Sequence, residues 1–192
     1  MSKTYFISDT HWGHAKTIEF DQRPFANVEE MDAELIRRWN AKVKKDDVVY
    51  VLGDMIWSSV CAESLIQSLN GQIILIMGNH DHVFEKAKYK SMLAGVKEYD
   101  EIFVHLKDGT RCKVVLSHYF IPFYNGYRKQ GIHLHGHSHN SKEYLEEEQI
   151  KSKLIADGYA IRSYNVGCMH WNYEPVTLDE ILEREASQLE QT

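Results

Sequence analysis

Carboxylate, carboxamide and imidazole side chains recur in five short blocks of this sequence. In chain order the blocks are Asp9-Thr10-His11, Gly53-Asp54, Gly78-Asn79-His80-Asp81, Ser117-His118 and Gly136-His137-Ser138-His139. Their oxygen and nitrogen donors suit manganese, iron or zinc, and they differ from the thiolates of a structural zinc site. The chain also has 11 histidines in 192 residues, and this excess favours a metal site because neutral imidazole is the commonest protein metal ligand.

Two of the blocks place a pair of candidate ligands two residues apart. Asp9 and His11 have this spacing, and so do His137 and His139. An extended backbone would point both members of such a pair to the same side, so that both reach one cluster. The carboxylate of Asp54 has two oxygens and can bridge two cations about 4 Å apart.

The hydrophobic pattern predicts a scaffold that brings these distant blocks together. Apolar runs rich in Val, Ile and Leu end just before the blocks, at 4–8, 48–52, 73–77, 111–117 and 132–135. Amphipathic stretches alternate with the early runs, which is typical of an α/β protein. Because the carboxyl ends of strands lie along one sheet edge, we expect the blocks to converge there. The adjoining glycines are expected to allow unusual dihedrals and close backbone approach: Gly53, Gly78 and Gly136.

Three helices are predicted from apolar spacing and capping signals. The first follows Asn27, with Glu30 in the capping-box position. The second covers the apolar stripe of 61–69 and stops at the Asn-Gly pair that follows. The third begins at Thr177, with Glu180 in the capping-box position, and runs to the end of the chain.

The second half of the chain also carries strand signals. Stretches 101–106 and 111–117 flank an Asp-Gly turn at 107–110, which predicts a β-hairpin. A further short strand is predicted over 160–166. The charged stretch 141–153 indicates either a helix or a mobile excursion.

In their order and composition the five blocks resemble the calcineurin-like metallophosphoesterase superfamily. Its signature reads DxH, GD, GNHD, a histidine that usually follows glycine, and GHxH, and the resemblance covers residues 9–139. The resemblance implies a four-layer α/β sandwich of two mixed β-sheets flanked by helices, with two divalent metal ions at the sheet edge. One ion would be bound by Asp9, His11, Asp54 and His139, and the other by Asp54, Asn79, His118 and His137. His80 would be the proton donor or a phosphate contact, oriented by Asp81.

Two further stretches resemble a small bacterial and phage-like subgroup of predicted phosphoesterases. They are Asp9-Thr10-His11-Trp12-Gly13-His14 and Arg23-Pro24-Phe25. The chain departs from the pattern at Ser117, where the family often has Gly, and at Tyr119-Phe120-Ile121-Pro122, where the subgroup tends to read His-Tyr-Pro from His118. Neither departure removes a ligand.

The resemblance implies hydrolysis of a phosphate ester by a hydroxide that bridges the two ions. The expected substrates are phosphodiesters of small molecules or nucleotides, and the expected metal is manganese, with iron, zinc or nickel as alternatives. A phosphomonoesterase, a protein phosphatase or a nuclease would use the same centre. A noncatalytic protein-binding scaffold of the same fold is the alternative from another class, although this chain lacks none of the ligands or the proton donor.

Aromatic and basic residues near the blocks are candidates for substrate contacts. Trp12, His14 and Arg23 are predicted to bind substrate. Three aromatic residues could stack on a base or only cover the edge of the core: Trp57, Tyr124 and Tyr127. Arg128 could bind phosphate or only be exposed to solvent. The other histidines are expected to be ordinary surface or core residues: His82, His105, His133, His135 and His170.

Size and composition narrow the class of protein. A chain of 192 residues with 43% hydrophobic residues predicts one domain over residues 1–192. The net charge of −6 argues against binding long nucleic acid. No apolar run of membrane-spanning length or signal peptide is found, so we expect a cytoplasmic protein. The cysteines at 61, 112 and 168 are too few and too scattered for a disulfide framework.

Overall fold

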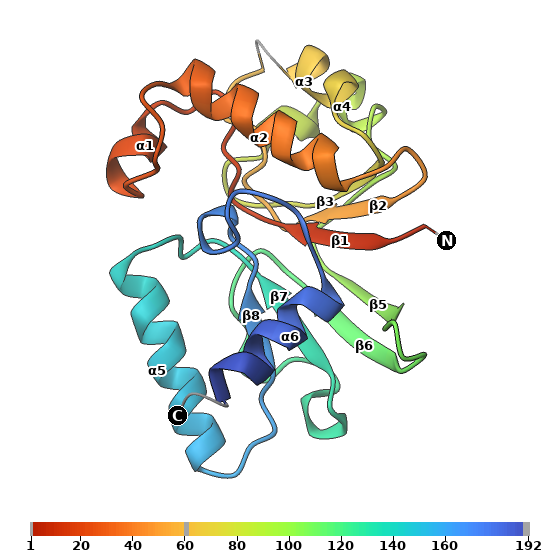
Figure 1. Cartoon of the computed structure of the whole chain (residues 1–192), viewed down its shortest axis with the longest axis vertical. Coiled ribbons are helices and arrows are strands. Elements are labelled where there is room, and N and C mark those ends of the chain that lie inside the picture. The colour runs from red at the N-terminus through yellow and green to blue at the C-terminus, as the bar shows by residue number, and fades with distance from the viewer. Residues whose placement is uncertain (1, 60–61, 190–192) are drawn as a thin grey trace.

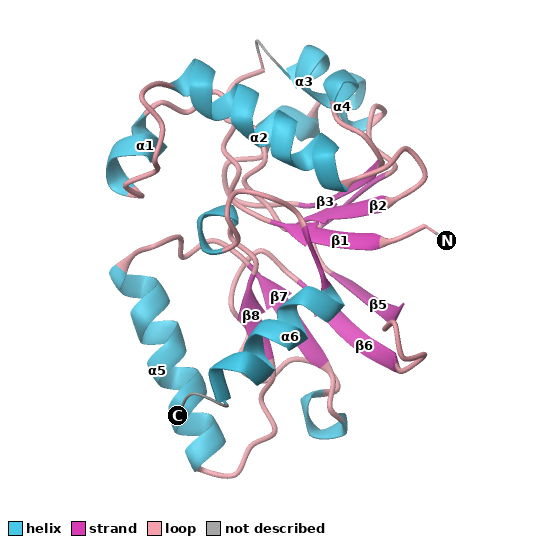
Figure 2. Ribbon diagram, in the orientation of Figure 1, coloured by secondary structure: helices cyan, strands magenta, loops and turns pink. Residues whose placement is uncertain are grey.

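Two β-sheets lie at the centre of the molecule, with helices outside them (Figure 1). The computed structural model describes residues 2–59 and 62–189. The expected start of the second helical stripe at Cys61 lies outside these residues. In Figure 2, the three helices α2 (Val28–Lys42), α3 (Ala62–Ser68) and α4 (Ala87–Lys90) cover the outer side of one sheet, while α5 (Lys142–Ala156) lies beside the other. The predicted sandwich of two sheets with flanking helices is therefore confirmed.

The first sheet has the order β4-β3-β2-β1-β9. Its four parallel strands are β1 (Thr4–Ile7), β2 (Val48–Val51), β3 (Gln72–Ile76) and β4 (Gly95–Lys97). The short strand β9 (Val176–Thr177) pairs antiparallel with β1, so the sheet is mixed.

The second sheet has the order β5-β6-β7-β8 and is also mixed. The predicted hairpin is present as β5 (Asp100–His105) and β6 (Arg111–Leu116), which pair antiparallel. The other strands, β7 (Ile132–His135) and β8 (Ser163–Asn165), continue the sheet in parallel.

Alternate side chains of the central strands enter two different apolar layers. In β1, Phe6 packs between the two sheets, whereas Tyr5 and Ile7 pack on the opposite face under the helices. The same alternation separates Tyr50 from Val49 in β2. Both faces of the sheet are thus buried, which explains why these strands read as continuous apolar runs.

The two predicted capping signals begin helices. In α2 (Val28–Lys42), the Asn27 side chain accepts a hydrogen bond from the Glu30 N–H at 2.8 Å. Before α6 (Leu178–Leu189), Thr177 Oγ1 accepts from the Glu180 N–H at 3.3 Å, and Glu180 accepts from the Thr177 N–H at 2.7 Å. These bonds satisfy donors that an uncapped helix leaves free.

The remaining helices complete the two outer layers. The charged stretch 141–153, predicted to be either a helix or a mobile excursion, is a helix, α5 (Lys142–Ala156). The apolar stripe of 61–69 forms α3 (Ala62–Ser68). The sequence pattern did not predict two short helices, α1 (Lys16–Phe20) and α4 (Ala87–Lys90), or the short strands β4 and β9. Over 160–166, only the three residues of β8 form a strand. Across the described residues, every helix is too short or too polar to cross a lipid bilayer.

Candidate metal centre

The five sequence blocks meet between the ends of the two sheets. The first three follow β1, β2 and β3 of one sheet, and the other two follow β6 and β7 of the other. Each block therefore lies at the carboxyl end of a strand, as predicted. The convergence involves two facing sheets rather than one sheet edge, because each sheet contributes part of the set.

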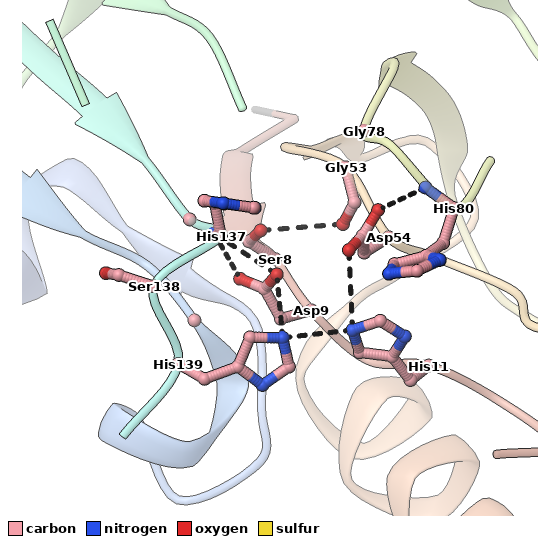
Figure 3. A network of polar contacts seen from close by, with 12 residues as sticks. Ser8, Asp9, His11, Gly53, Asp54, Gly78, His80, His137, Ser138 and His139 are labelled. Atoms are coloured by element: carbon pink, nitrogen blue, oxygen red, sulfur yellow. Dashed lines mark hydrogen bonds and ion pairs between the residues drawn. The ribbon is translucent and has the colours of Figure 1, made fainter. Parts of the chain in front are cut away.

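One group of donors combines two carboxylates and two imidazoles, and its ligand atoms all lie within 4.8 Å of one another: Asp9, His11, Asp54 and His139. The Nε2 atoms of His11 and His139 are 3.1 Å apart (Figure 3). His11 Nε2 lies 3.5 Å from Asp54 Oδ2, and His139 Nε2 lies 3.5 Å from Asp9 Oδ1. This group matches the first set implied by the family resemblance.

A second group shares Asp54 with the first and adds His118 and His137. His118 Nε2 lies 3.6 Å from Asp54 Oδ2 and 3.2 Å from His137 Nδ1. Asn79 Oδ1 is 3.1 Å from the same His118 nitrogen. The structure thus brings all seven candidate ligands together, with Asp54 common to both groups.

The tautomers of two histidines show that this donor set fits a cation. His118 Nδ1 contacts the Leu52 carbonyl at 2.8 Å, and a carbonyl can only accept, so Nδ1 carries the proton. In the neutral ring Nε2 is then an acceptor, and it faces Asn79 Oδ1 and Asp54 Oδ2, which are also acceptors. Several acceptors that converge in this way are favourable around a positive ion.

His139 is held in the same way. Its Nδ1 lies 2.9 and 3.0 Å from the two oxygens of Asp21, and therefore donates to them. Burial alone would raise the pKa of Asp21, but the bond and charge of His139, together with Arg23, lower it. Burial also lowers the pKa of His11, with a further contribution from His139, so His11 is held in the neutral form that binds metals.

The backbone at five of the seven ligands is left-handed. The positive φ angles are 56° at Asp9, 50° at His11, 54° at Asp54, 73° at His137 and 49° at His139. The expectation that extended backbone aligns the paired ligands is therefore wrong. Such conformations cost free energy for residues other than glycine, and they concentrate at functional sites where the surroundings fix them.

The neighbouring glycines act in two different ways. Gly53 has a φ of 92°, which only glycine adopts easily. Gly78 and Gly136 do not have positive φ, so the predicted unusual dihedral is wrong for them. A Cβ at Gly136 would instead overlap Ser8 Oγ, and one at Gly78 would overlap Asp54 Oδ1. These two positions need glycine because the metal-binding loops approach so closely.

His80 lies at the centre, but Asp81 does not orient it. The backbone N–H of His80 donates to Asp54 Oδ1 at 2.9 Å, and the centroid of the His80 ring lies 5.6 Å from that of His11. Asp81 is fully buried, and its oxygens accept from the N–H groups of Asp54 at 2.7 Å, Met55 at 2.9 Å and Gly78 at 2.8 Å. Within the described residues these are its hydrogen bonds, so the expected Asp81–His80 pairing is wrong. Asp81 instead ties two ligand loops together.

Two of the three predicted substrate contacts are buried. Trp12 is 1% exposed and packs edge-on against Trp39 in the core, with ring centroids 5.9 Å apart. Arg23 is 3% exposed, and its guanidinium donates to the Asp21 carboxylate and to the carbonyl of Asp9 at 2.8 Å. Neither side chain is available to substrate. Arg23 holds the first ligand loop from behind.

The third predicted contact, His14, is half-buried beside the centre. Its ring stacks on Trp57 with centroids 3.7 Å apart and an interplanar angle of 2°. Of the stacking candidates, Trp57 is exposed at the site, whereas Tyr124 is buried. Tyr127 contacts Phe123 instead, and Arg128 contacts Tyr127. The sequence pattern gave no reason to single out two exposed aromatic residues that also border the centre, Phe20 and Tyr119.

Ser117, the residue that departs from the family pattern, belongs to a buried relay. Its hydroxyl donates to the Tyr119 carbonyl at 2.6 Å, so it accepts from His133 Nε2 at 2.8 Å. His133 Nδ1 then accepts from Ser163 Oγ at 2.9 Å. The relay supports the loop that carries His118, and it accounts for one of the histidines expected to be an ordinary core residue.

The other histidines lie outside both ligand groups of the described residues. His135 is buried, while His82 and His105 are exposed. His170 Nε2 donates to the carbonyl of His139 at 2.9 Å, so it supports a ligand loop from outside.

Known proteins resemble this chain in sequence over most of its length. An uncharacterized protein of Methanocaldococcus jannaschii is 37% identical over 185 residues, covering 95% of this chain and 90% of that protein. The gene 66 protein of Mycobacterium phage L5 is 31% identical over 190 residues, covering 82% and 89%.

A solved structure shares the fold. It is a protein of unknown function from Aquifex aeolicus, with a TM-score of 0.65 and 24% identity, covering 98% of this chain and 100% of that one. The calcineurin-like phosphoesterase family matches residues 2–171, a span that contains all five blocks and every strand of both sheets except β9. The chain therefore belongs to the calcineurin-like phosphoesterase family.

Proposed function

We propose that this protein hydrolyses phosphodiesters of small molecules or nucleotides with two divalent metal ions. Family membership supports a phosphoester hydrolase. The observation that carries the dinuclear proposal is Asp54, whose carboxylate belongs to both ligand groups. A shared carboxylate is the usual bridge between two catalytic cations.

The chain's own residues have distinct tasks in this proposal. When bound, the ions would supply charge that stabilises the phosphate oxygens and lowers the pKa of water. Asp9, His11, Asp54 and His139 would hold one ion, and Asp54, Asn79, His118 and His137 the other. The backbone N–H of His80 donates to Asp54 Oδ1, and the His80 ring beside His11 would donate a proton to the departing oxygen.

Two aromatic borders support a diester over a monoester. Tyr119 lies against the second ligand group, with its ring centroid 4.5 Å from that of His137. Trp57 lies beside His80, with the two ring centroids 5.0 Å apart. A diester has two organic groups linked to phosphorus through oxygen, and Tyr119 and Trp57 could each contact one of them. Strict monoesters would use only one of them.

We propose manganese as the metal and the cytoplasm as the location. Mixed carboxylate, carboxamide and imidazole donors suit manganese, and iron, zinc or nickel remain alternatives. The described cysteines, Cys112 and Cys168, are free thiols, which fits a reducing compartment. Long nucleic acid is not among the proposed partners, because the net charge is −6.

The test combines metal content with a substrate panel. The protein is loaded with manganese, nickel, zinc or iron, and bound metal is counted by elemental analysis. Each form is then assayed on mono- and diesters, including bis(4-nitrophenyl) phosphate, 4-nitrophenyl phosphate and cyclic nucleotides. Two ions per chain with faster diester hydrolysis are expected. Strict monoester activity would replace the diester proposal, cleavage of long DNA would favour a nuclease, and binding without hydrolysis would favour a scaffold.

A further inference from the structure

Exposed aromatic side chains border the metal centre. Trp57 is 44% exposed, Phe20 is 55% exposed and Tyr119 is 51% exposed. They come from three separate segments, namely the loop after β2, the end of α1 and the loop after β6. Exposed apolar surface beside a polar site is a common feature of ligand pockets, where it contacts the organic part of the ligand.

Trp57 is held more firmly than an ordinary surface side chain. The His14 ring stacks flat on the indole at 3.7 Å. The backbone under both rings is held as well: the backbone N–H of Trp57 donates to the Trp12 carbonyl at 3.0 Å, and Thr17 Oγ1 donates to the His14 carbonyl at 2.7 Å. A side chain fixed in this way loses little conformational entropy when a ligand stacks on it.

The position of Trp57 relative to His80 identifies the part of the substrate that it would meet. The two ring centroids are 5.0 Å apart, with the planes tilted by 50°. In the proposed function, His80 donates its proton to the oxygen of the departing group. The organic group on that oxygen must therefore lie next to the indole.

We propose that Trp57 is the stacking surface for a planar aromatic leaving group, so the substrates are aryl or nucleoside esters rather than simple alkyl esters. This inference rests on the proposed function. In the reaction, the oxygen of water forms a bond to phosphorus while the bond to the leaving oxygen breaks. The leaving oxygen takes a proton from His80. The attacking water releases one proton to solvent, and His80 regains one from solvent, so the protons balance. Trp57 takes no part in bond making and sets only the preference for the leaving group.

The size of the effect follows from stacking free energies. Stacking of a base on an aromatic side chain is worth about 1–3 kcal/mol, or roughly five- to 150-fold in affinity. Replacing Trp57 should remove that factor for aromatic ligands and leave alkyl ligands almost unchanged. A general disturbance of the metal centre would weaken both kinds of ligand equally.

The experiment compares phenylphosphonate with methylphosphonate, which share the phosphonate and differ in the aromatic ring. Their affinities for the manganese-loaded protein are measured by titration calorimetry for the native chain, Trp57→Ala, Trp57→Phe and Phe103→Ala. Phe103 is a matched control, because it is 54% exposed but contacts Arg111 away from the centre. Thermal unfolding and metal content establish that each variant is folded and loaded.

We expect the native chain to bind phenylphosphonate at least about tenfold more tightly than methylphosphonate. In Trp57→Ala the ratio should fall to within about twofold, in Trp57→Phe it should be intermediate, and in Phe103→Ala it should be unchanged. An unaltered ratio in folded Trp57→Ala, or an equal loss for both ligands, overturns the proposal.

Hydrolysis separates this inference from the proposed function. The kcat/KM values for phenyl and methyl esters of one nucleotide are measured alongside the binding. If the protein binds aryl ligands selectively but hydrolyses neither ester, the proposed function is wrong and the role of Trp57 as an aromatic binding surface is supported. Because phenoxide leaves more easily than methoxide, the ratio of the two kcat/KM values is compared between the native chain and Trp57→Ala. Hydrolysis of both esters with a ratio that Trp57→Ala does not lower would keep the function and remove the role of Trp57.

Discussion

The carboxylate of Asp21 accepts a hydrogen bond from Nδ1 of His139 and thereby points Nε2 of that ring toward Asp9 and His11. Asp21 is buried and is also paired with Arg23, whose guanidinium donates to the carbonyl of Asp9. A single carboxylate outside the ligand set thus fixes the ring of one ligand and, through Arg23, the backbone of another. Such supporting partners set the tautomer and basicity of a metal-binding histidine.

Replacing Asp21 should weaken metal binding. In Asp21→Ala, His139 loses its acceptor and Arg23 loses its buried partner, so we expect about a 10- to 100-fold lower affinity for the ion that His139 would bind. Titration calorimetry with manganese measures this change. Glu19→Ala, an exposed substitution in the neighbouring helix α1, is the control. Equal affinities in Asp21→Ala and the native chain would contradict a supporting role.

His80 should matter for turnover and not for metal content. Its ring belongs to neither ligand group of the described residues, whereas its N–H is bonded to Asp54. We expect His80→Ala and His80→Asn to retain both ions and to lose about 100-fold or more in kcat on bis(4-nitrophenyl) phosphate. Native turnover in a fully loaded variant would exclude His80 as the proton donor.

Asp54 should matter for both ions at once. Its carboxylate is the one that both ligand groups share, so Asp54→Ala removes a donor from each. Elemental analysis after gel filtration should find fewer than about one ion in ten chains, since each site loses its bridging oxygen. Retention of two ions would show that the bridge lies elsewhere.

The sequence predicted the parts of this molecule that depend on local chemistry. The capping boxes at Asn27 and Thr177 and the Asp-Gly hairpin are set by neighbouring residues, and all three are present. Strands β4 and β9 contain only three and two residues, too few for any periodicity to register. They exist because longer neighbours offer them hydrogen-bonding partners.

The same distinction explains the errors at the centre. The ligand types could be recognised from their order, but the direction of each side chain depends on left-handed backbone at residues such as Asp9 and His137. Trp12 was misassigned because a residue next to a ligand can point to the opposite side, into the core. Phe20 and Tyr119 were missed because their place at the centre depends on tertiary packing.

Asp81 should contribute to stability rather than to the protonation of His80. Its two oxygens are the acceptors for three N–H groups, two of them buried and one half-buried, and Asp81→Asn replaces one oxygen with an NH2 group that cannot accept. We expect a loss of about 2–4 kcal/mol in the free energy of unfolding, measured with urea on metal-free protein. Asp108→Asn in the exposed hairpin turn is the control. A native unfolding curve together with a shifted pH–rate profile would restore the orienting role.

Glu147 should give the folded state a distinctive dependence on pH. It lies on α5, is buried, and accepts a 2.6 Å hydrogen bond from Ser138, between two metal-ligand candidates. Burial raises the pKa of Glu147 to about 7, against the effect of the Ser138 bond and with help from Glu143 and Glu148. Between about pH 4.5 and 7 the folded state therefore binds more protons than the unfolded chain, and its stability falls as the pH rises.

Glu147→Gln should remove that dependence because glutamine stays neutral. Urea unfolding of both metal-free proteins at pH 5 and pH 8 should show the variant gaining about 1–3 kcal/mol relative to the native chain at the higher pH. A buried histidine with a lowered pKa outside the contacts of Glu147, such as His133, destabilises both proteins equally at acid pH, so its contribution cancels in the comparison. His135 Nδ1 lies 4.0 Å from Glu147 Oε2, so its contribution is part of the measured difference. Glu146→Gln, exposed on the same helix, should leave the difference near zero. If the native and Glu147→Gln curves run parallel from pH 5 to 8, the carboxyl group of Glu147 is ionised throughout and the helix is not tied to the last ligand loop by a protonated side chain.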